Sequence, residues 1–311
     1  MNTLIDNAEI GVVVDAGSKL GYGHAVRSVR LARALARRNR VVFYPLSEPC
    51  KAFVEAAGFK TVDLGESFPP LVITDLREAH GITAAIHRNG SRHISVHDLG
   101  LAQCHSDVAI DGSVTRLFPY GTDRTRELFL GPQYMITRDA VARSAITDTV
   151  LVTFGGGATA RYAAGVAEQL SGLGLKPITT QGFLGSKPLS DAEIAEAMST
   201  CCFAISGSGV TLYDLLASGV PTIAVAFDRI QLRTADAFHE LGAVLSAGVM
   251  ERLSPTAIVR YCKEMLENGP LVQRITQAGQ ILVDGKGLSR VVEIVRRQLW
   301  LTSQEKTYTA C

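Results

Sequence analysis

The chain carries almost no net charge: among its 311 residues, 31 Lys and Arg stand against 30 Asp and Glu. A surface without an excess of positive charge does not attract nucleic acid or an anionic membrane at long range. The sequence also lacks any stretch of about 18 consecutive apolar residues, the length that a membrane-spanning helix needs. We therefore expect neither nucleic-acid binding nor stable insertion in a membrane.

Cysteine is scarce, and its spacing follows no regular pattern. The six cysteines contain no C-x-x-C pair, and two of them are adjacent at positions 201 and 202. This spacing argues against zinc knuckles and against a framework of disulfides. The first ten residues, MNTLIDNAEI, lack the basic and apolar regions of a secretory signal. These features predict a cytoplasmic protein with reduced thiols.

Motifs for several common kinds of chemistry are missing. No H-E-x-x-H motif is present, and the sequence predicts no metal site and no cofactor. The absence of a G-x-S-x-G elbow, a Walker A motif and the protein-kinase motifs disfavours acyl transfer and phosphoryl transfer.

Short runs of β-branched residues alternate with helical patterns along the whole chain. Continuous apolar strands separated by helices indicate parallel sheets that are covered on both faces. Two sets of five such runs predict two doubly wound, Rossmann-like domains of the α/β class. The expected strands lie at 10–15, 40–45, 71–75, 93–98 and 107–111 in the first set and at 149–154, 176–181, 201–206, 221–227 and 242–247 in the second.

The segment 131–148 ends the first series of strands and leads into the second. We therefore expect an N-terminal domain at 1–145, a C-terminal domain at 146–303 and a tail at 304–311. The late helical stretch 288–301 has an apolar face, which we expect to pack on a domain rather than enter a membrane. No feature predicts self-association, so a monomer is expected.

The two sets of strands end in different residue types. Asp15, Asp75, Asp98 and Asp111 each end a first-set strand, whereas second-set strands end in glycines, serines and amides. Ligands of open parallel sheets bind beyond the carboxyl ends of the strands, and buried carboxylates there need partners or water. We therefore expect two rims that face each other across a cleft, with Asp75 and Asp98 binding substrate and Asp111 capping a helix.

The stretch LGYGHAVR (20–27) lies between the first expected strand and a helix. The positive end of a helix dipole favours neutral imidazole, which is the form that a general base requires. We predict His24 as the catalytic base and Asp15, at the preceding strand end, as the group that orients it. The alternative is a tight turn with an incidental histidine. His97, beside Asp98, is a second candidate, and His239 is expected to be structural.

Two glycine-rich turns follow second-set strands. Gly155, Gly156 and Gly157 in TFGGGATARYAAG lie where backbone N–H groups and a helix N-terminus favour an anion, although a plain turn is equally compatible. No acidic residue follows at the spacing that nicotinamide cofactors need, which disfavours them. The second turn, in ISGSGVTLYDLLASGVPTIAVAFDRIQ (205–231), combines small side chains with free amides suited to phosphate. The residues concerned are Ser206, Gly207, Ser208 and Gly209.

Asp214, in the helix after the second turn, has two readings. Its carboxylate is placed to accept hydrogen bonds from ribose hydroxyls. Alternatively, it is a negative charge that complements the dipole near the start of the helix. The spacing alone does not separate these readings.

Three segments resemble the nucleotide-sugar hydrolases of pseudaminic acid biosynthesis and, more distantly, the peptidoglycan N-acetylglucosaminyltransferase. They are DAGSKLGYGHAVRSVRLARAL (15–35), GPQYMITRDAV (131–141) and AISGSGVTLYDLLASGVPTIAVAFDRIQ (204–231). Both families are metal-independent proteins with two Rossmann-like domains of the GT-B type, so the resemblance implies that fold. It also implies a UDP-sugar or another nucleotide sugar as substrate.

The resemblance assigns roles residue by residue. His24 takes the position of the base that activates water against the anomeric carbon, and Asp214 stands where the family has a ribose-binding Glu. The remaining matches are substrate-binding positions: Gly21, Gly23 and Arg27 around the base, Tyr134 and Arg138 between the domains, Gly207 to Thr211 at the diphosphate, and Gln231. Three positions depart from the pattern, namely Val13, Ala158 and His97.

Together these features predict metal-independent hydrolysis of a nucleotide-activated amino sugar in surface-glycan biosynthesis. The alternative enzyme is an inverting GT-B glycosyltransferase that uses the same donor with a hydroxyl acceptor. The expected absence of an apolar, basic face for a lipid-linked acceptor favours hydrolysis. A sugar-nucleotide-binding protein without catalysis is the third alternative.

Overall fold

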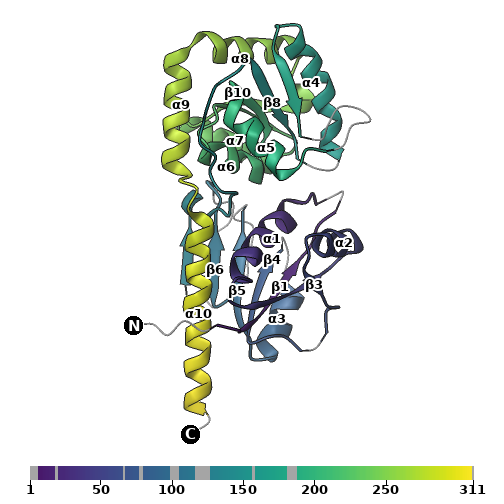
Figure 1. The fold of residues 1–311 in the computed structure, drawn as a ribbon, viewed down its shortest axis with the longest axis vertical. Helices are drawn as coiled ribbons and strands as arrows, with labels where there is room; N and C mark the ends of the chain where they lie inside the picture. The colour runs from purple at the N-terminus through teal and green to yellow at the C-terminus, as the bar shows by residue number, and fades with distance from the viewer. Residues whose placement is uncertain are drawn as a thin grey trace. The chain divides into compact units, whose positions relative to one another are not determined.

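The computed structural model describes residues 6–17, 20–65, 67–76, 80–98, 105–115, 127–155, 158–180 and 188–309. The chain divides into two units (Figure 1), of which unit 1 comprises residues 1–136 and 286–311 and unit 2 comprises residues 137–285. The chain passes from unit 1 to unit 2 after residue 136 and back to unit 1 after residue 285, whereas the sequence predicted domain boundaries at 145 and 303. The chain leaves unit 1 earlier, and its last helix belongs to unit 1 rather than to the second domain.

Unit 1 contains a fully parallel seven-stranded sheet in the order β3-β2-β1-β4-β5-β6-β7. All five strands expected in this half are present, because each is a short apolar run that the sheet buries. Two further strands at the sheet edges, β3 and β7, were not expected. The strands are β1 (Glu9–Val14), β2 (Arg40–Pro45), β3 (Lys60–Thr61), β4 (Leu71–Asp75), β5 (Arg92–His97), β6 (Val108–Asp111) and β7 (Glu127–Leu130).

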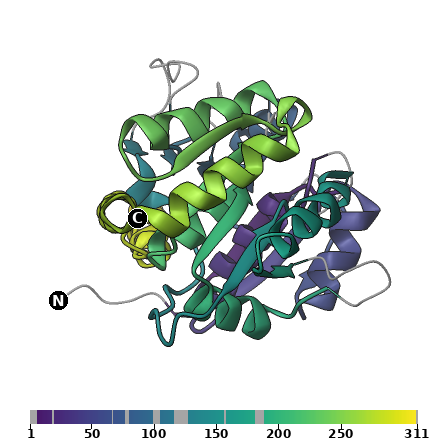
Figure 2. The ribbon, with the colours of Figure 1, turned by 90° about the horizontal axis from the view of Figure 1, so that it is seen from above.

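Helices cover both faces of this sheet (Figures 1 and 2). On one face, strand residues such as Val12 and Ile94 form a core with Leu31 of α1 and Val295 of α10. On the other face, Val13 and Val72 pack with Ile86 of α3. Besides a short 3-10 turn at Pro132–Tyr134, the helices are α1 (Gly23–Leu35), α2 (Glu48–Ala56), α3 (His80–Arg88) and α10 (Gly287–Thr309).

The return of α10 to unit 1 depends on nonlocal packing. Val291 and Val295 are fully buried in the unit 1 core. At the start of the helix, a Cβ on Gly287 would lie 1.9 Å from the carbonyl oxygen of Met135, so only glycine fits there. The helix also continues to Thr309, through most of the segment expected to be a tail.

Unit 2 contains a parallel five-stranded sheet in the order β12-β11-β10-β8-β9, and all five expected strands are present. One face packs against α4, α8 and α9 and the other against α5 and α6. The strands are β8 (Thr149–Thr153), β9 (Lys176–Thr179), β10 (Phe203–Gly207), β11 (Thr222–Ala226) and β12 (Leu245–Val249). The helices are α4 (Tyr162–Ser171), α5 (Asp191–Thr200), α6 (Val210–Ala217), α7 (Arg229–Glu240), α8 (Pro255–Glu267) and α9 (Gly269–Leu282).

Four helices of unit 2 begin at a side-chain cap, whereas α4 and α6 do not. Ser190, Asp228, Ser254 and Asn268 each accept hydrogen bonds from the first turn of α5, α7, α8 and α9. The N-cap of α6 is Gly209, which has no side chain to accept such a bond. The first N–H groups of α6 therefore have no side-chain cap.

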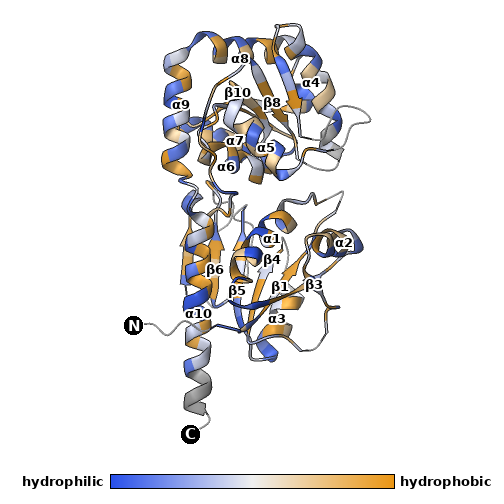
Figure 3. Cartoon of the chain, viewed as in Figure 1, coloured by the Kyte–Doolittle hydropathy of each residue, from blue (hydrophilic) through white to orange (hydrophobic). Residues whose placement is uncertain are grey.

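Hydropathy follows this layering (Figure 3): the strands of both sheets are largely hydrophobic, as strands buried on two faces must be. Within the described ranges, none of the helices combines the length and the apolar run that crossing a bilayer requires.

Candidate active site

The candidate base lies at the start of α1, just after a closed loop. Gly17 and Gly21 form two backbone hydrogen bonds with each other, of 2.7 and 3.2 Å, and Gly21 has a φ of 78° that favours glycine. Gly23 is the first residue of α1 and His24 the second. The loop therefore carries the chain from the end of β1 directly into the helix that bears His24.

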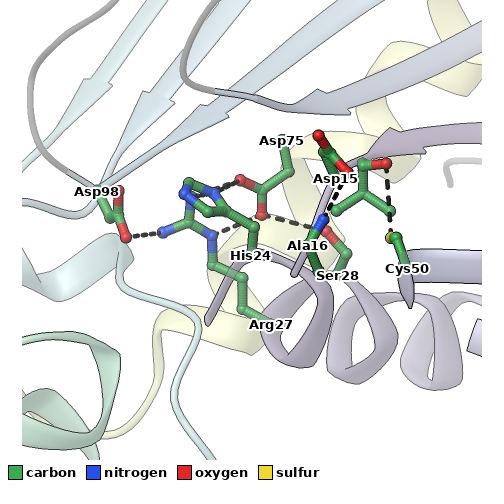
Figure 4. A network of polar contacts seen from close by, with 9 residues as sticks. Asp15, Ala16, His24, Arg27, Ser28, Cys50, Asp75 and Asp98 are labelled. Carbon is green, nitrogen blue, oxygen red and sulfur yellow. Dashed lines mark hydrogen bonds and ion pairs between the residues drawn. The ribbon is translucent and has the colours of Figure 1, made fainter. Parts of the chain in front are cut away.

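Topology brings Asp75 to His24. Strands β1 and β4 are neighbours, and Val14 pairs with Asp75, so Asp75 ends its strand at the carboxyl edge of the sheet beside α1. The carboxylate oxygen Oδ1 lies 2.6 Å from His24 Nδ1 (Figure 4). Both side chains are nearly buried, with 9% of His24 and 2% of Asp75 exposed. The pair links two segments that are 51 residues apart.

Asp75 is ionised in this environment. Burial alone would raise the pKa of its carboxyl, but the charges and hydrogen bonds of Arg27 and His24 outweigh burial and hold the pKa well below its usual range. An ionised carboxylate only accepts hydrogen bonds. Although Arg27 Nη2 also lies 3.0 Å from His24 Nδ1, the shorter contact to Asp75 requires that Nδ1 carries the proton.

The protonated Nδ1 leaves the other ring nitrogen, Nε2, as an acceptor. Among the described residues, Nε2 of His24 has no hydrogen-bond partner. A histidine that donates through Nδ1 to a carboxylate and keeps Nε2 as an acceptor has the arrangement of a general base. This arrangement is what the opening motif predicted for His24, with a different carboxylate.

Asp15 is not the partner of His24, which corrects the expectation from sequence. Its Oδ1 instead accepts hydrogen bonds from Ala16 N at 2.8 Å and from Ser47 Oγ at 2.5 Å. These contacts fix the chain after β1 and the start of α2. The strand order explains the difference, because β4 lies beside β1 and its last residue, Asp75, reaches His24.

Arg27 is buried, whereas the sequence suggested a substrate-binding residue. The residue is 1% exposed, and its guanidinium forms ion pairs with Asp75 at 2.5 Å and with Asp98 Oδ2 at 2.8 Å (Figure 4). Asp98 keeps 17% of its side chain exposed. Of the carboxylates expected to line this edge, Asp75 is enclosed by protein partners and Asp98 retains access to solvent.

Ser28 belongs to the same network, and sequence reasoning missed it. Its Oγ donates to Asp75 Oδ2 at 3.1 Å. His24, Arg27 and Ser28 have the helical spacing i, i+3 and i+4, which places three donors on one face of α1. That spacing of polar residues inside an otherwise apolar helix face is the signal that would have found the network.

The second candidate histidine lies on the other face of the sheet. Ile94 and Val96 of β5 belong to the core on the side of the sheet covered by α1 and α10, so strand alternation directs His97 to the opposite side. Burial, partly opposed by Asp111 and Asp75, lowers the pKa of His97 to about 4. Asp111, expected to cap a helix, caps a turn through Ser113 N at 2.8 Å.

In unit 2, the carboxyl edge presents backbone rather than side chains. Ser206 and Ser208 are buried, and Ser208 Oγ donates to the carbonyl of Val225 at 2.9 Å, so neither hydroxyl is directed outward. Gly209 is exposed and Thr211 partly exposed at the uncapped start of α6. The sequence predicts that the N–H groups there bind an anion, and this stays a prediction.

Gly155 follows β8 with a φ of 73°, and Thr159 Oγ1 closes the turn on the carbonyl of Phe154 at 2.7 Å. Gly156 and Gly157 lie outside the described residues. Gln231 is the third residue of α7, and its Oε1 accepts from Phe227 N at 3.3 Å, which holds the loop after β11.

Asp214 is tied to the chain that enters unit 2. Its carboxylate accepts from Arg138 N at 2.9 Å and from Arg138 Nε at 3.3 Å. Asp214 is the fifth residue of α6, beyond the first turn, so its ion pair with Arg138 explains its position better than the helix dipole does. Contact with ribose stays a prediction. Tyr134, the other expected residue of the connecting segment, packs against Phe129 within unit 1.

Within the described residues, no group of three or more His, Cys, Asp or Glu side chains is arranged to hold a metal ion. The cysteines described there are free thiols at positions 50, 201, 202 and 262.

Comparison with known proteins places the fold. No family model matches the chain. The spore coat polysaccharide biosynthesis protein SpsG of Bacillus subtilis (strain 168) is 24% identical over 92% of this chain and 97% of its own length. The calicheamicin glycosyltransferase CalG4 superposes over 96% of this chain and 99% of its own, with a TM-score of 0.65 and 15% identity. For MurG of Acinetobacter baumannii these values are 93%, 99%, 0.61 and 12%.

The chain has the GT-B fold. This confirms the predicted class of two parallel-sheet α/β domains. At such low identities the solved structures show the GT-B fold alone, and the reaction has to be argued from the residues at the two carboxyl edges.

Proposed function

We propose that the protein is an enzyme of polysaccharide biosynthesis that transfers the sugar of a nucleotide sugar to a hydroxyl acceptor, with His24 as the general base. The observation that carries the proposal is the buried His24–Asp75 pair at the carboxyl edge of unit 1. The likeness to SpsG over nearly the whole chain and the GT-B fold support both the substrate class and the setting.

In unit 1, His24 removes a proton from the attacking group. The acceptor hydroxyl gives its proton to Nε2 while its oxygen forms a bond to the anomeric carbon. The bond from that carbon to the diphosphate oxygen breaks, and the nucleoside diphosphate leaves with the bonding electrons. A single displacement of this kind inverts the anomeric configuration. Asp75 stabilises the imidazolium that forms, because its negative charge lies 2.6 Å from Nδ1.

In unit 2, backbone amides stabilise the leaving group. The uncapped start of α6, where Gly209 is exposed, offers N–H groups to a diphosphate. Each well-placed donor is typically worth roughly 3 kcal/mol when charge develops in the transition state.

Hydrolysis is the second candidate. It is favoured by the opening motif, GYGHAVR (21–27), which resembles that of nucleotide-sugar hydrolases. The same base then activates water, and no acceptor site is needed. We place transfer first because SpsG, which is similar over nearly the whole chain, is a polysaccharide biosynthesis protein, and building a polysaccharide joins sugars to hydroxyl acceptors.

The two candidates separate in an assay of UDP release from a panel of UDP-sugars, with and without a glycan extract as acceptor. Release that depends on the extract supports transfer, whereas equal release without it supports hydrolysis. His24→Ala should abolish release in either case. If the protein binds UDP but releases it from no UDP-sugar under either condition, it is a binding protein and the proposal is wrong.

A further inference from the structure

Arg27 is the largest of the fully buried side chains, and the proposed reaction gives it no part. Removing a guanidinium from water costs several kcal/mol unless partners compensate for the loss. Such a group in a small α/β unit therefore calls for a specific role. Its burial excludes direct contact with a substrate that approaches from solvent.

Carboxylates occupy each side of the guanidinium. Nε donates to Asp75 Oδ2 at 2.6 Å and Nη2 donates to Asp75 Oδ1 at 2.5 Å, which is a bidentate pair. Nη1 lies 2.8 Å from Asp98 Oδ2. Arg27 thus joins the end of β4 to the residue that follows β5.

These contacts fix the plane of the Asp75 carboxylate. Oδ2 receives Arg27 Nε and Ser28 Oγ, while Oδ1 receives Arg27 Nη2 and His24 Nδ1. With three donors from α1 other than the imidazole, the carboxylate has one orientation, and that orientation directs Oδ1 to His24. The guanidinium also offsets the negative charge that would otherwise face the imidazole.

The surroundings of this pair are predominantly acidic. Besides Arg27 itself, the titratable groups near this pair come from the ends of β1, β5 and β6 and from α2. They are Asp15, Cys50, His97, Asp98 and Asp111. Arg27 is the cation that interacts with Asp75, Asp98 and Asp111 together.

We infer that Arg27 is a positioning residue for the base: it holds ionised Asp75 so that His24 keeps its proton on Nδ1 and accepts the next one on Nε2. The inference rests on the proposed function in assigning a base to the reaction. Loss of Arg27 would leave two uncompensated carboxylates beside the imidazole, which favours the imidazolium.

The kinetic test compares Arg27→Gln and Arg27→Lys with Arg33→Gln, which makes the same change at an exposed site on the same helix. Arg27→Gln should lower kcat by about 10²-fold. It should also move the acidic limb of the kcat/KM profile up by about one pH unit. Arg27→Lys should recover part of kcat, and Arg33→Gln should resemble the wild type. A raised KM with unchanged kcat and an unmoved profile would instead assign Arg27 to substrate binding and overturn the inference.

A double-variant cycle tests whether Arg27 acts on catalysis through Asp75. If Arg27 acts through Asp75, the Arg27→Gln/Asp75→Asn protein should be no slower than Asp75→Asn alone, within about twofold. If instead the losses of kcat from the two single variants multiply in the double variant, Arg27 acts independently of Asp75 and the inference is overturned. The double variant removes both buried charges, so it remains measurable if Arg27→Gln alone fails to fold.

A readout independent of turnover distinguishes this inference from the proposed function. Nitrogen-15 NMR of the full chain at pH 8 should show His24 protonated at Nδ1, and Arg27→Gln or Arg27→Lys should shift the population toward Nε2. An unchanged tautomer would overturn the inference. An absence of turnover in the wild type would contradict the proposed function and leave the NMR result to decide the role of Arg27.

Discussion

The carboxyl edge of the unit 1 sheet carries ionised side chains, whereas the corresponding edge in unit 2 carries backbone amides and small residues. His24, Arg27 and Asp75 interact within a buried network in unit 1. At the start of α6 in unit 2, Gly209 offers N–H groups and no side chain. The two sheets are both parallel but differ in strand order, and the groups at their carboxyl edges differ as well: side chains in unit 1 and backbone amides in unit 2.

The carboxyl edges of the two sheets should respond differently to substitution. A network of side chains fails when one partner is removed, because the remaining charges stay buried and unpaired. A site made of backbone tolerates changes of side chain nearby but fails when added atoms block the approach of a ligand.

The largest effect is expected from His24→Ala. Loss of the base should lower turnover by about 10³-fold, because general base catalysis contributes on the order of 10² to 10⁴. The affinity for UDP should not change, because the nucleotide is assigned to unit 2. Turnover and calorimetry with UDP measure the two quantities, and His239→Gln on α7 is the matched control. A parallel loss of UDP affinity would contradict the division of roles.

Asp75→Asn should lower both activity and stability. The amide leaves the buried Arg27 without its bidentate partner, and breaking such a pair costs about 3 to 5 kcal/mol. Trp300, the single tryptophan, lies on α10 of unit 1, so its fluorescence reports unfolding of that unit. We expect the tryptophan transition to move to lower denaturant concentration. An unchanged transition would show that the network contributes no stability.

Acid should destabilise unit 1 before unit 2. Burial, with the neighbouring His87 and His97, lowers the pKa of His93 to about 3 from 6.5, so the fold holds it neutral. The unfolded chain binds a proton below pH 6.5, and the stabilisation is therefore complete above that pH and lost as pH falls toward 3. His97, with a pKa of about 4, acts in the same direction.

At pH 5 each of these histidines should cost on the order of 2 kcal/mol. Unit 2 contains a single histidine, His239, which lies at the surface of α7. Denaturant titrations followed by tryptophan fluorescence report unfolding of unit 1, and the part of the circular dichroism change that does not coincide with it reports unfolding of unit 2. Between pH 7 and pH 5, the midpoint for unit 1 should fall more than the midpoint for unit 2. His93→Gln should reduce the shift. Equal shifts of both transitions would refute the assignment to unit 1.

The smallest effect is expected from Gly209→Ala. A Cβ there meets nothing within 4 Å, and the φ of −102° suits any residue, so folding should be unaffected. If a diphosphate approaches these amides, the methyl group should weaken UDP binding by about 1 kcal/mol, or roughly fivefold. Gly165→Ala on α4, which is also unobstructed, is the control. Unchanged UDP affinity would show that the diphosphate does not bind at these amides.

The sequence predicted the strands well and the contacts between them less well. All ten expected strands exist, because a buried parallel strand needs a local apolar run that is visible in the sequence. Edge strand β3 has two residues, and such a short pairing depends on its neighbour β2 rather than on its own pattern.

The candidate site shows the same limit. His24 was identifiable from its glycine loop, but its partner was assigned to Asp15 because that residue is nearer in sequence. The order of strands in the sheet decides the partner, and that order brings β4 next to β1. The burial of Arg27 was also not predictable, since it depends on Asp75 and Asp98 meeting the same helix face.

Because α10 belongs to unit 1, that unit is sensitive to truncation of the chain. Because residues 286–311 complete the unit that begins the chain, a premature stop after Gly285 would leave unit 2 whole and strip unit 1 of a helix. The lost segment includes Val291 and Val295, whose removal would expose the interior beside Ile94 to water. Truncation at this point should therefore inactivate unit 1, although most of unit 1 lies far upstream in the sequence.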